Sequence, residues 1–323
     1  MRTEVRQARP VIAVLAALVL TLLAVPFAHA GFDIGTGSQF AVLSEASSTS
    51  LQFNNGVIDG DIGIGSPRTF QASGPGTING NIRFSGASSV SGLPAGNIQW
   101  TGSVVANDAA VASALSTVNS LAVTLGAEAG TTLNINIANG GTQTVNASAG
   151  ILDGNGNRVF TVGSLQTFNF SGGSTLVING SASEYVVINI NQDADFKGAI
   201  QLTGGITSDH VLFNIIGGDS TQQDTCVNTG ACTGGHKLNI NTNGDTVTGI
   251  FLDAMGVINE NHSVLDGRLF GGDTQNMSIV SGGDIHAPTT VPEPATLLLV
   301  GTALAAGGAA VRRRRARSQA LPV

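Results

Sequence analysis

The amino-acid sequence predicts a mainly β protein, an irregular β-solenoid (β-helix) with one long α-helix packed alongside it. Three observations support this fold class: a short glycine-centred pattern that recurs along the chain, many strand-like runs with alternating apolar residues, and a single amphipathic helical stripe. An apolar segment near each end adds a predicted N-terminal signal helix and a predicted C-terminal transmembrane helix. We therefore expect three regions, at 1–30, 31–288 and 289–323.

The first region has the organisation of a secretory signal peptide. Arginines precede an apolar run at residues 11–27, and the small residues Ala28 and Ala30 follow it. A signal peptidase reads this order of basic, apolar and small residues, so we expect cleavage before Gly31. An uncleaved N-terminal anchor is the alternative.

The β-solenoid prediction depends on a pattern of an apolar residue, a polar residue, glycine, any residue and a second apolar residue. The copies lie at 58–62, 78–82, 196–200 and 265–269. The first two are 20 residues apart, which is typical of one solenoid coil. Asn-Gly and Asp-Gly permit the positive φ of a tight corner, and the flanking aliphatic residues can point inward. The later copies are irregular, and a β-sandwich with Asn-Gly hairpins is the competing interpretation.

Many runs between these copies have the composition of short strands. Leu133, Ile135 and Ile137 alternate with polar residues, as do Leu238 and Ile240. The predicted strands are 131–137, 174–178, 185–190, 211–216, 237–241 and 246–252.

Residues 108–125 interrupt this β pattern and are predicted to form the helix. The apolar residues recur at spacings of 4, 3, 4 and 3, which makes one helical stripe. Asn107 or Asp108 can cap its start, and Gly126 suits its end. We expect the helix to cover a long edge of the β body.

The composition of residues 31–290 restricts the partners of the protein. This segment has 19 acidic and six basic residues, a formal net charge of −13. Such an acidic surface disfavours nucleic acid and anionic lipid, although divalent cations remain compatible with it. About 260 residues suffice for one domain core.

The C-terminal region has three parts: a short proline motif, an apolar run at residues 295–311 and a basic cluster. The motif is Val291, Pro292, Glu293 and Pro294, and the basic residues are Arg312, Arg313, Arg314, Arg315 and Arg317. The apolar run has 17 uncharged residues, near the lower limit for crossing a bilayer. The arginines should stay cytoplasmic, which places the preceding residues outside.

This tail resembles the PEP-CTERM sorting signal of Gram-negative bacteria. The resemblance implies that a membrane enzyme, exosortase, recognises the Pro-Glu-Pro motif and removes the apolar tail. Anchoring in the inner membrane would then be transient, and the protein would reach the cell surface or extracellular matrix. A plain single-pass anchor is the alternative.

The ectodomain also resembles known domains, through weak and glycine-rich motifs. Residues 40–43 and 57–63 are similar to the start of the ice-binding-like β-solenoid family, in which a helix lies along a discontinuous solenoid. Residues 265–272 and 279–282 look more like the "choice-of-anchor A" domains of bacterial surface proteins. The resemblance implies a solenoid with a helix, and it transfers no activity.

Cys226 and Cys232 are the two cysteines of the chain, and we expect them to form a disulfide because the protein is exported. A metal site with His236 is the alternative, but it lacks a fourth ligand.

Three Gly-Gly-Asp triplets, ending at Asp219, Asp273 and Asp284, lack the period of calcium-binding solenoids and are expected to form turns. We therefore expect neither a metal nor another cofactor, with calcium as the less favoured alternative.

The sequence contains no recognised catalytic motif. Asp193 and Asp195 could form a glycosidase-type carboxylate pair, but such residues in a loop are usually solvated.

The threonine pairs 142/144 and 246/248 could contact ice, yet no such pair repeats at the spacing of the coils. We therefore predict a non-enzymatic surface or matrix protein that binds polysaccharide or a surface protein. An ice-binding protein is the first alternative, and a carbohydrate-active enzyme is the second.

Overall fold

The structure is a computed structural model that describes residues 31–46, 49–93, 98–216, 236–272 and 277–288. The chain has two compact units, Met1–Ala287 and Pro288–Val323, and every element described below belongs to the first. The predicted signal helix, transmembrane helix and sorting motif lie outside the described residues.

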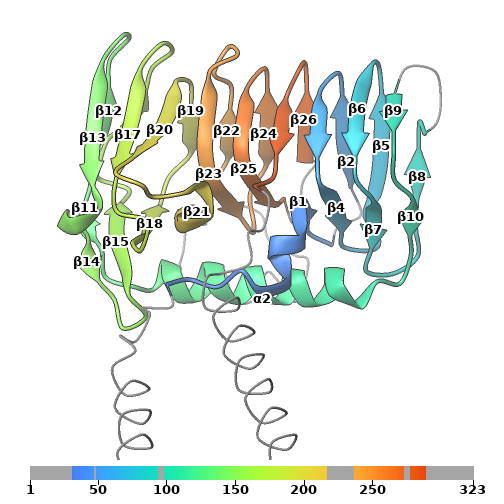
Figure 1. Ribbon diagram of the computed structural model, residues 1–323, viewed down its shortest axis with the longest axis horizontal. Helices are drawn as coiled ribbons and strands as arrows, with labels where there is room; N and C mark the ends of the chain where they lie inside the picture. The colour runs from blue at the N-terminus through green and yellow to red at the C-terminus, as the bar shows by residue number, and fades with distance from the viewer. Residues whose placement is uncertain (1–30, 47–48, 94–97, 217–235, 273–276, 289–323) are drawn as a thin grey trace, which may run out of the picture. The chain divides into compact units, whose positions relative to one another are not determined.

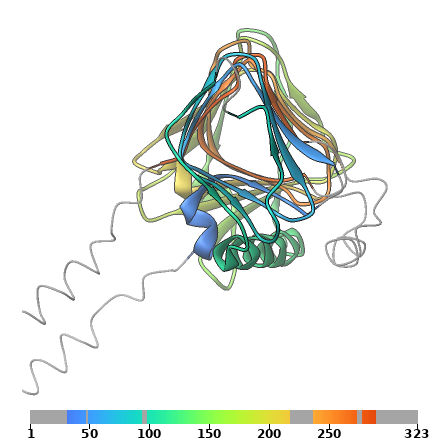
Figure 2. The same ribbon diagram turned by 90° about the vertical axis from the view of Figure 1, so that its right-hand side faces the viewer.

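The first unit is a β-solenoid whose coils turn three corners, so that its strands lie on three faces, here called a, b and c (Figure 2). Face a contains β10 (Val104–Val105), β7 (Ile82–Phe84), β4 (Asp61–Ile64), β1 (Phe40–Ser44), β25 (Val264–Gly271), β23 (Thr246–Asp253), β21 (Val211–Ile215), β18 (Tyr185–Ile190), β15 (Asn157–Val162) and β11 (Thr131–Thr132). Neighbouring described strands are parallel, except that β14 (Ile151–Leu152) is antiparallel to β15. The predicted fold class is confirmed.

The other two faces have the same order of coils. Face b contains β9 (Ile98–Trp100), β6 (Gly76–Asn79), β3 (Val57–Asp59), β27 (Asp284–His286), the first halves of β25 and β23, β20 (Ala199–Thr203), β17 (Thr175–Asn179) and β13 (Thr142–Asn146). Face c contains β8 (Val90–Ser91), β5 (Thr69–Ser73), β2 (Ser50–Asn54), β26 (Met277–Val280), β24 (Ile258–Asn261), β22 (Leu238–Ile240), β19 (Ala194–Phe196), β16 (Phe168–Phe170) and β12 (Ile135–Ile137). Short 3-10 turns occur at Gly35–Gln39, Ala147–Ala149 and Ser208–His210.

The solenoid is discontinuous in sequence, as the colours of Figure 1 show. The first coils, ending at β10, form one end, and α2 (Ala109–Gly126) then runs along the stack to the other end. The second series of coils starts at β11 and winds back until β25, β26 and β27 pair with β1, β2 and β3. The two series therefore meet in the middle of the stack, and three parallel pairings close the junction.

The glycine-centred pattern marks corners of the coils. Gly60 turns the chain from β3 to β4 with a φ of +133°, as the expected positive φ requires. At Gly80 the reason is different, because a Cβ there would lie 2.2 Å from the carbonyl oxygen of Gly60 on the preceding coil. Gly267 likewise approaches the carbonyl oxygen of Gly249. Close stacking of corners, as well as turn conformation, thus selects glycine.

The helix α2 matches the predicted segment to within one residue at each end. The side chain of Asp108 caps it by accepting a hydrogen bond from the Ala110 N–H at 2.8 Å, whereas Gly126 lies inside the last turn and Ala127 takes the C-cap position. The helix covers the sheet of face a and not an edge, since its buried stripe packs on apolar residues that point outward from that sheet. These outward residues include Leu43, Val159, Val187, Leu212 and Ile250.

Two buried asparagines fix the helix to face a. Asn189 donates a hydrogen bond to the carbonyl oxygen of Leu125 at 2.7 Å, and Asn214 donates to that of Ala122 at 3.0 Å. By length and composition α2 could also cross a membrane, but its apolar stripe is used in this packing. Because the helix occupies face a, the binding surfaces to consider are faces b and c.

Two buried arginines cross the junction in opposite directions. Arg68, from the first series of coils, donates to the carbonyl oxygens of Glu45 and Gly272. Arg268, from the second series, donates to the carbonyl oxygen of Phe40 at 2.7 Å and to Asp209 at 3.2 Å. Both side chains are almost completely buried, so their donors must be matched by acceptors within the protein.

Two carboxyl groups are also buried. Asp253 accepts hydrogen bonds from the N–H groups of Gly256 and Met255, and Glu260 points inward from β24 and accepts one from the Ser263 hydroxyl. Burial raises the pKa of both groups to about 8, because the charged carboxylate is poorly solvated there.

We expect Arg68→Ala to lower the free energy of unfolding by about 3 kcal/mol or more, because it leaves buried carbonyl groups without a donor. Urea unfolding measures this change. Arg158→Ala is the control, since the half-exposed Arg158–Glu184 pair at 3.6 Å should contribute less than about 1 kcal/mol. Equal effects of the two substitutions would contradict the role of Arg68.

We expect stability to fall as the pH rises from about 4 to 8, because Asp253 and Glu260 bind protons more tightly in the folded than in the unfolded state. The double variant Asp253→Asn, Glu260→Gln should flatten the dependence of Tm on pH between pH 5 and 9. Asp59→Asn is the control. The hydrogen bond from Asn79, aided by His286, lowers the pKa of Asp59, so this carboxylate is ionised in both the folded and the unfolded state above pH 5. Its removal should therefore leave the slope unchanged. A double variant that keeps the wild-type slope would disprove the assignment.

Candidate functional site

Face b presents a flat, uncharged array of side chains at one end of the solenoid. Its strands β13, β17 and β20 each have five residues and point three of them outward. The outward residues are Thr142, Thr144 and Asn146 on β13, Thr175, Val177 and Asn179 on β17, and Ala199, Gln201 and Thr203 on β20. Neighbouring positions are about 4.8 Å apart across the strands and about 6.7 Å apart along them.

The register between coils aligns residues of similar kind. Thr142 lies opposite Thr175, and Thr144 lies opposite Val177. The expectation that threonine pairs do not recur at the spacing of the coils is therefore incomplete. Hydroxyl and methyl groups do align, but through a step of 33 residues that differs from the 20-residue step of the first coils. The result is a mixed array of threonine, valine and asparagine and not a pure threonine ladder.

The array continues onto the first halves of β23 and β25. Thr246 and Thr248 point outward from β23, and Val264 pairs with Thr246 on the next coil. Asp266 is the first charged side chain that the array meets. We call the outward residues from β13 to Val264 the neutral half of face b.

Hydrogen bonds between coils hold one row of the neutral half in place. The Asn179 side-chain amide donates to the Asn146 side-chain oxygen at 2.9 Å, and the Thr203 hydroxyl donates to the Asn179 oxygen at 3.1 Å. The β-branched threonine and valine side chains restrict their own χ1 angles. The neutral half therefore loses little conformational entropy when it contacts a ligand.

The middle of face b, on β25, β27 and β3, is charged. His286 lies 2.6 Å from Asp59 through Nδ1, and the Asn79 amide donates to the other oxygen of Asp59 at 2.6 Å. The hydrogen bond from Asn79, followed by that from His286, lowers the pKa of Asp59. Asp266 on β25 lies opposite His286, and Asp284 on β27 lies opposite Val264. No local sequence pattern indicates the His286–Asp59 pair, because the two residues are 227 positions apart.

One row of polar side chains runs along the whole of face c, and the longer strands β2, β5, β24 and β26 point a second row outward that includes Asn54, Ser73, Asn261 and Val280. The side chains of the first row pair in register from one coil to the next, in the order Asp195, Asn239, Asn259, Ser278, Gln52, Gln71 and Ser91. On the neighbouring strands β12 and β16, Asn136 pairs with Asn169. The strands β12, β16, β19 and β22 have three residues each, so each points one side chain outward. At this end face c thus offers a line of groups, whereas the neutral half of face b offers a plane.

The candidate carboxylates Asp193 and Asp195 lie at the edge of this row. Asp193 accepts a hydrogen bond from the Lys237 N–H at 2.9 Å, and Asp195 lies between the ammonium groups of Lys197 and Lys237 at 3.9 and 3.8 Å. Both carboxylates are exposed to solvent. They therefore lack the enclosed environment that tunes a catalytic pair.

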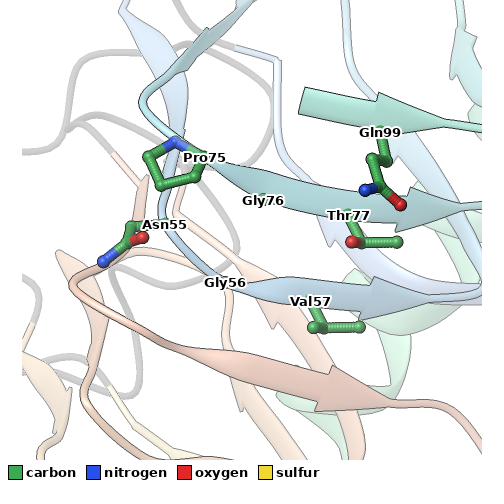
Figure 3. A pocket seen from close by; sticks show the side chains of 7 residues that line it. All are labelled: Asn55, Gly56, Val57, Pro75, Gly76, Thr77 and Gln99. Atoms are coloured by element: carbon green, nitrogen blue, oxygen red, sulfur yellow. The ribbon is translucent and has the colours of Figure 1, made fainter. Parts of the chain in front are cut away.

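A hollow lies at the corner between faces b and c, where β3, β6 and β9 begin (Figure 3). It is lined by Asn55, Gly56, Val57, Pro75, Gly76, Thr77 and Gln99. These residues have no titratable side chain, so the hollow supplies neither a general acid nor a general base.

The other predicted sites have different outcomes. Gly31 is the first described residue; it is buried, and its N–H donates to the Asn155 carbonyl oxygen at 3.1 Å. Cys226 and Cys232 lie outside the described residues, so the disulfide remains a prediction. Of the three glycine triplets, the one that ends at Asp284 is fully described: the Gly283 N–H donates to the Val280 carbonyl oxygen at 3.2 Å and closes a turn, as expected. Asp284 itself begins β27, and its carboxylate accepts a hydrogen bond from the Val57 N–H on the adjacent coil at 2.8 Å. No group of three metal-ligating side chains is found in the described part of the chain.

Comparison with known proteins supports the two resemblances in different ways. Residues 290–315 match the family model for the PEP-CTERM protein-sorting motif, so the chain carries this motif. No curated protein matches the sequence.

Several solved structures share the fold. An ice-binding protein from the Antarctic ascomycete Antarctomyces psychrotrophicus is 17% identical, with a TM-score of 0.52 over 80% of this chain and 100% of that chain. An ice-binding protein from an Antarctic bacterium of the Flavobacteriaceae is 14% identical, with a TM-score of 0.52 over 81% of this chain and 50% of that chain. At these identities the likeness shows the fold and leaves the ligand open.

Proposed function

We propose that this chain is an exported, non-enzymatic surface protein that binds ice through the neutral half of face b. The observation that carries the proposal is the flat array of uncharged hydroxyl, methyl and amide groups on in-register strands. Two structures with the same fold are described as ice-binding proteins, which supports ice as the ligand.

The chemistry of the neutral half suits a crystalline target. A solid surface cannot adapt to the protein, so the protein must present its groups in a fixed plane. The solenoid core and the bonds between Asn146, Asn179 and Thr203 provide this order before binding. Uncharged groups are also cheaper to dehydrate than the carboxylates on the other half of the face.

Export is the second part of the proposal. Signal peptidase would release Gly31 as the new N-terminus, and an exosortase-like enzyme would process the sorting motif at Val291–Pro294. The inner membrane would hold the protein only until this second cleavage. The cell surface or the extracellular matrix of a Gram-negative bacterium would be its final location.

Adhesion to a polysaccharide matrix is a second candidate function, and the polar row of face c favours it. Catalysis receives less support, because Asp193 and Asp195 are exposed and paired with basic groups.

We expect Val177→Lys to abolish inhibition of ice recrystallisation, because an ammonium group in the middle of the array keeps its water shell and prevents close contact. Val280→Lys is the matched control, since Val280 is also a half-buried valine on a strand, but on face c. Both variants are purified after export and compared with wild type at equal concentration. Equal loss in the two variants, or a wild type without activity, would refute ice binding through face b.

We expect the mature protein to lack residues 295–323, because the sorting motif directs removal of the apolar tail. Mass spectrometry of the exported protein identifies its C-terminus, and Glu293→Ala should retain the tail while Ser318→Ala should not. An intact tail on the wild-type surface protein would exclude this processing.

A further inference from the structure

The polar row on face c contains carboxamide groups that the protein itself does not use. We define the amide row as Asn136, Asn169, Asn239, Asn259, Gln52 and Gln71. Asn169 donates to the Asn136 side-chain oxygen at 3.0 Å. Within the described part of the chain, the side chains of Asn239, Asn259, Gln52 and Gln71 form no hydrogen bond. Each keeps two donor hydrogens and an acceptor oxygen available for a ligand.

The charges of the ectodomain limit which ligand can use this row. Every basic side chain between residues 31 and 288 already has a partner within the protein. Arg68 and Arg268 are buried at the junction, Arg83 binds Asp61 and Asp108, Arg158 binds Glu184, and Lys197 and Lys237 flank Asp195. A polyanion would therefore find no uncommitted cation here, and it would be repelled by the acidic net charge.

The shape of the row selects a chain and not a crystal. At the end of face c whose strands have three residues, each coil adds one outward position, so Asn136, Asn169 and Asn239 lie on a line parallel to the solenoid axis with about 4.8 Å between coils. Asn259, Gln52 and Gln71 extend this line over longer strands, where a second outward row lies beside it. Such a line matches a linear polymer that offers hydroxyl groups at intervals along its length. Carboxamides donate to and accept from hydroxyl groups without requiring charge on the ligand.

We propose that the amide row binds an uncharged polysaccharide chain that lies along face c. This proposal rests on export of the protein to the surface, but it is independent of ice binding through face b. The two faces would then have separate ligands, so that a molecule held on the matrix by face c keeps face b open.

Co-sedimentation of the exported protein with insoluble polymers tests this assignment. We expect retention on the uncharged polymers microcrystalline cellulose or cross-linked dextran, and weaker retention on the anionic polymer alginate, which the acidic ectodomain repels. The quadruple variant Asn239→Ala, Asn259→Ala, Gln52→Ala, Gln71→Ala should weaken binding at least about tenfold, because each lost hydrogen bond contributes modestly and four act together.

The matched control is the double variant Asn146→Ala, Asn179→Ala, which removes two asparagines from adjacent coils of face b. It should bind the uncharged polymer like wild type, and the quadruple variant should inhibit ice recrystallisation like wild type. Equal loss of polymer binding in both variants, preference for alginate, or no binding of wild type to either uncharged polymer would overturn the proposal. Polymer binding without any ice activity would instead refute only the function assigned to face b.

Discussion

The closure of the solenoid at the junction of its two series of coils is the constraint on which the remaining structure depends. Three parallel pairings, β1 with β25, β2 with β26 and β3 with β27, join segments more than 200 residues apart. Arg68 and Arg268 cross this junction in opposite directions and satisfy buried carbonyl groups on the other side. The closure of so long a loop costs entropy, and the burial of a common apolar core offsets that cost.

The helix α2 determines which surfaces of the solenoid are available. It connects the two series of coils and buries the outward apolar residues of face a as it does so. Asn189 and Asn214 donate to its last carbonyl groups, and Asp108 caps its first turn and binds Arg83. Faces b and c consequently differ from face a in composition, because most of their outward residues are polar, whereas those of face a under the helix are apolar.

The two available faces are suited to different targets because their strands differ in length. Five-residue strands give face b three outward positions per coil and therefore a plane. Three-residue strands give one end of face c a line. The charged half of face b, with Asp59, Asp266, Asp284 and His286, limits the plane to the coils from β13 to β25. Strand length and charge together thus distinguish the uncharged plane on face b from the line of polar groups at one end of face c.

The sequence by itself determined the features that short segments encode: the C-terminal sorting motif, the β-solenoid class, the corners at Gly60 and Gly80, and the helix from Ala109 to Gly126. Each depends on periodicity or on turn residues within a few consecutive positions. It did not reveal the array of face b, the Asp59–His286 pair or the amide row. Only the tertiary structure decided these, because successive coils differ in length and the register between them is set by burial of the core. Residues 20, 24, 33 or 227 positions apart become neighbours through that packing, and no local pattern records which of these separations applies.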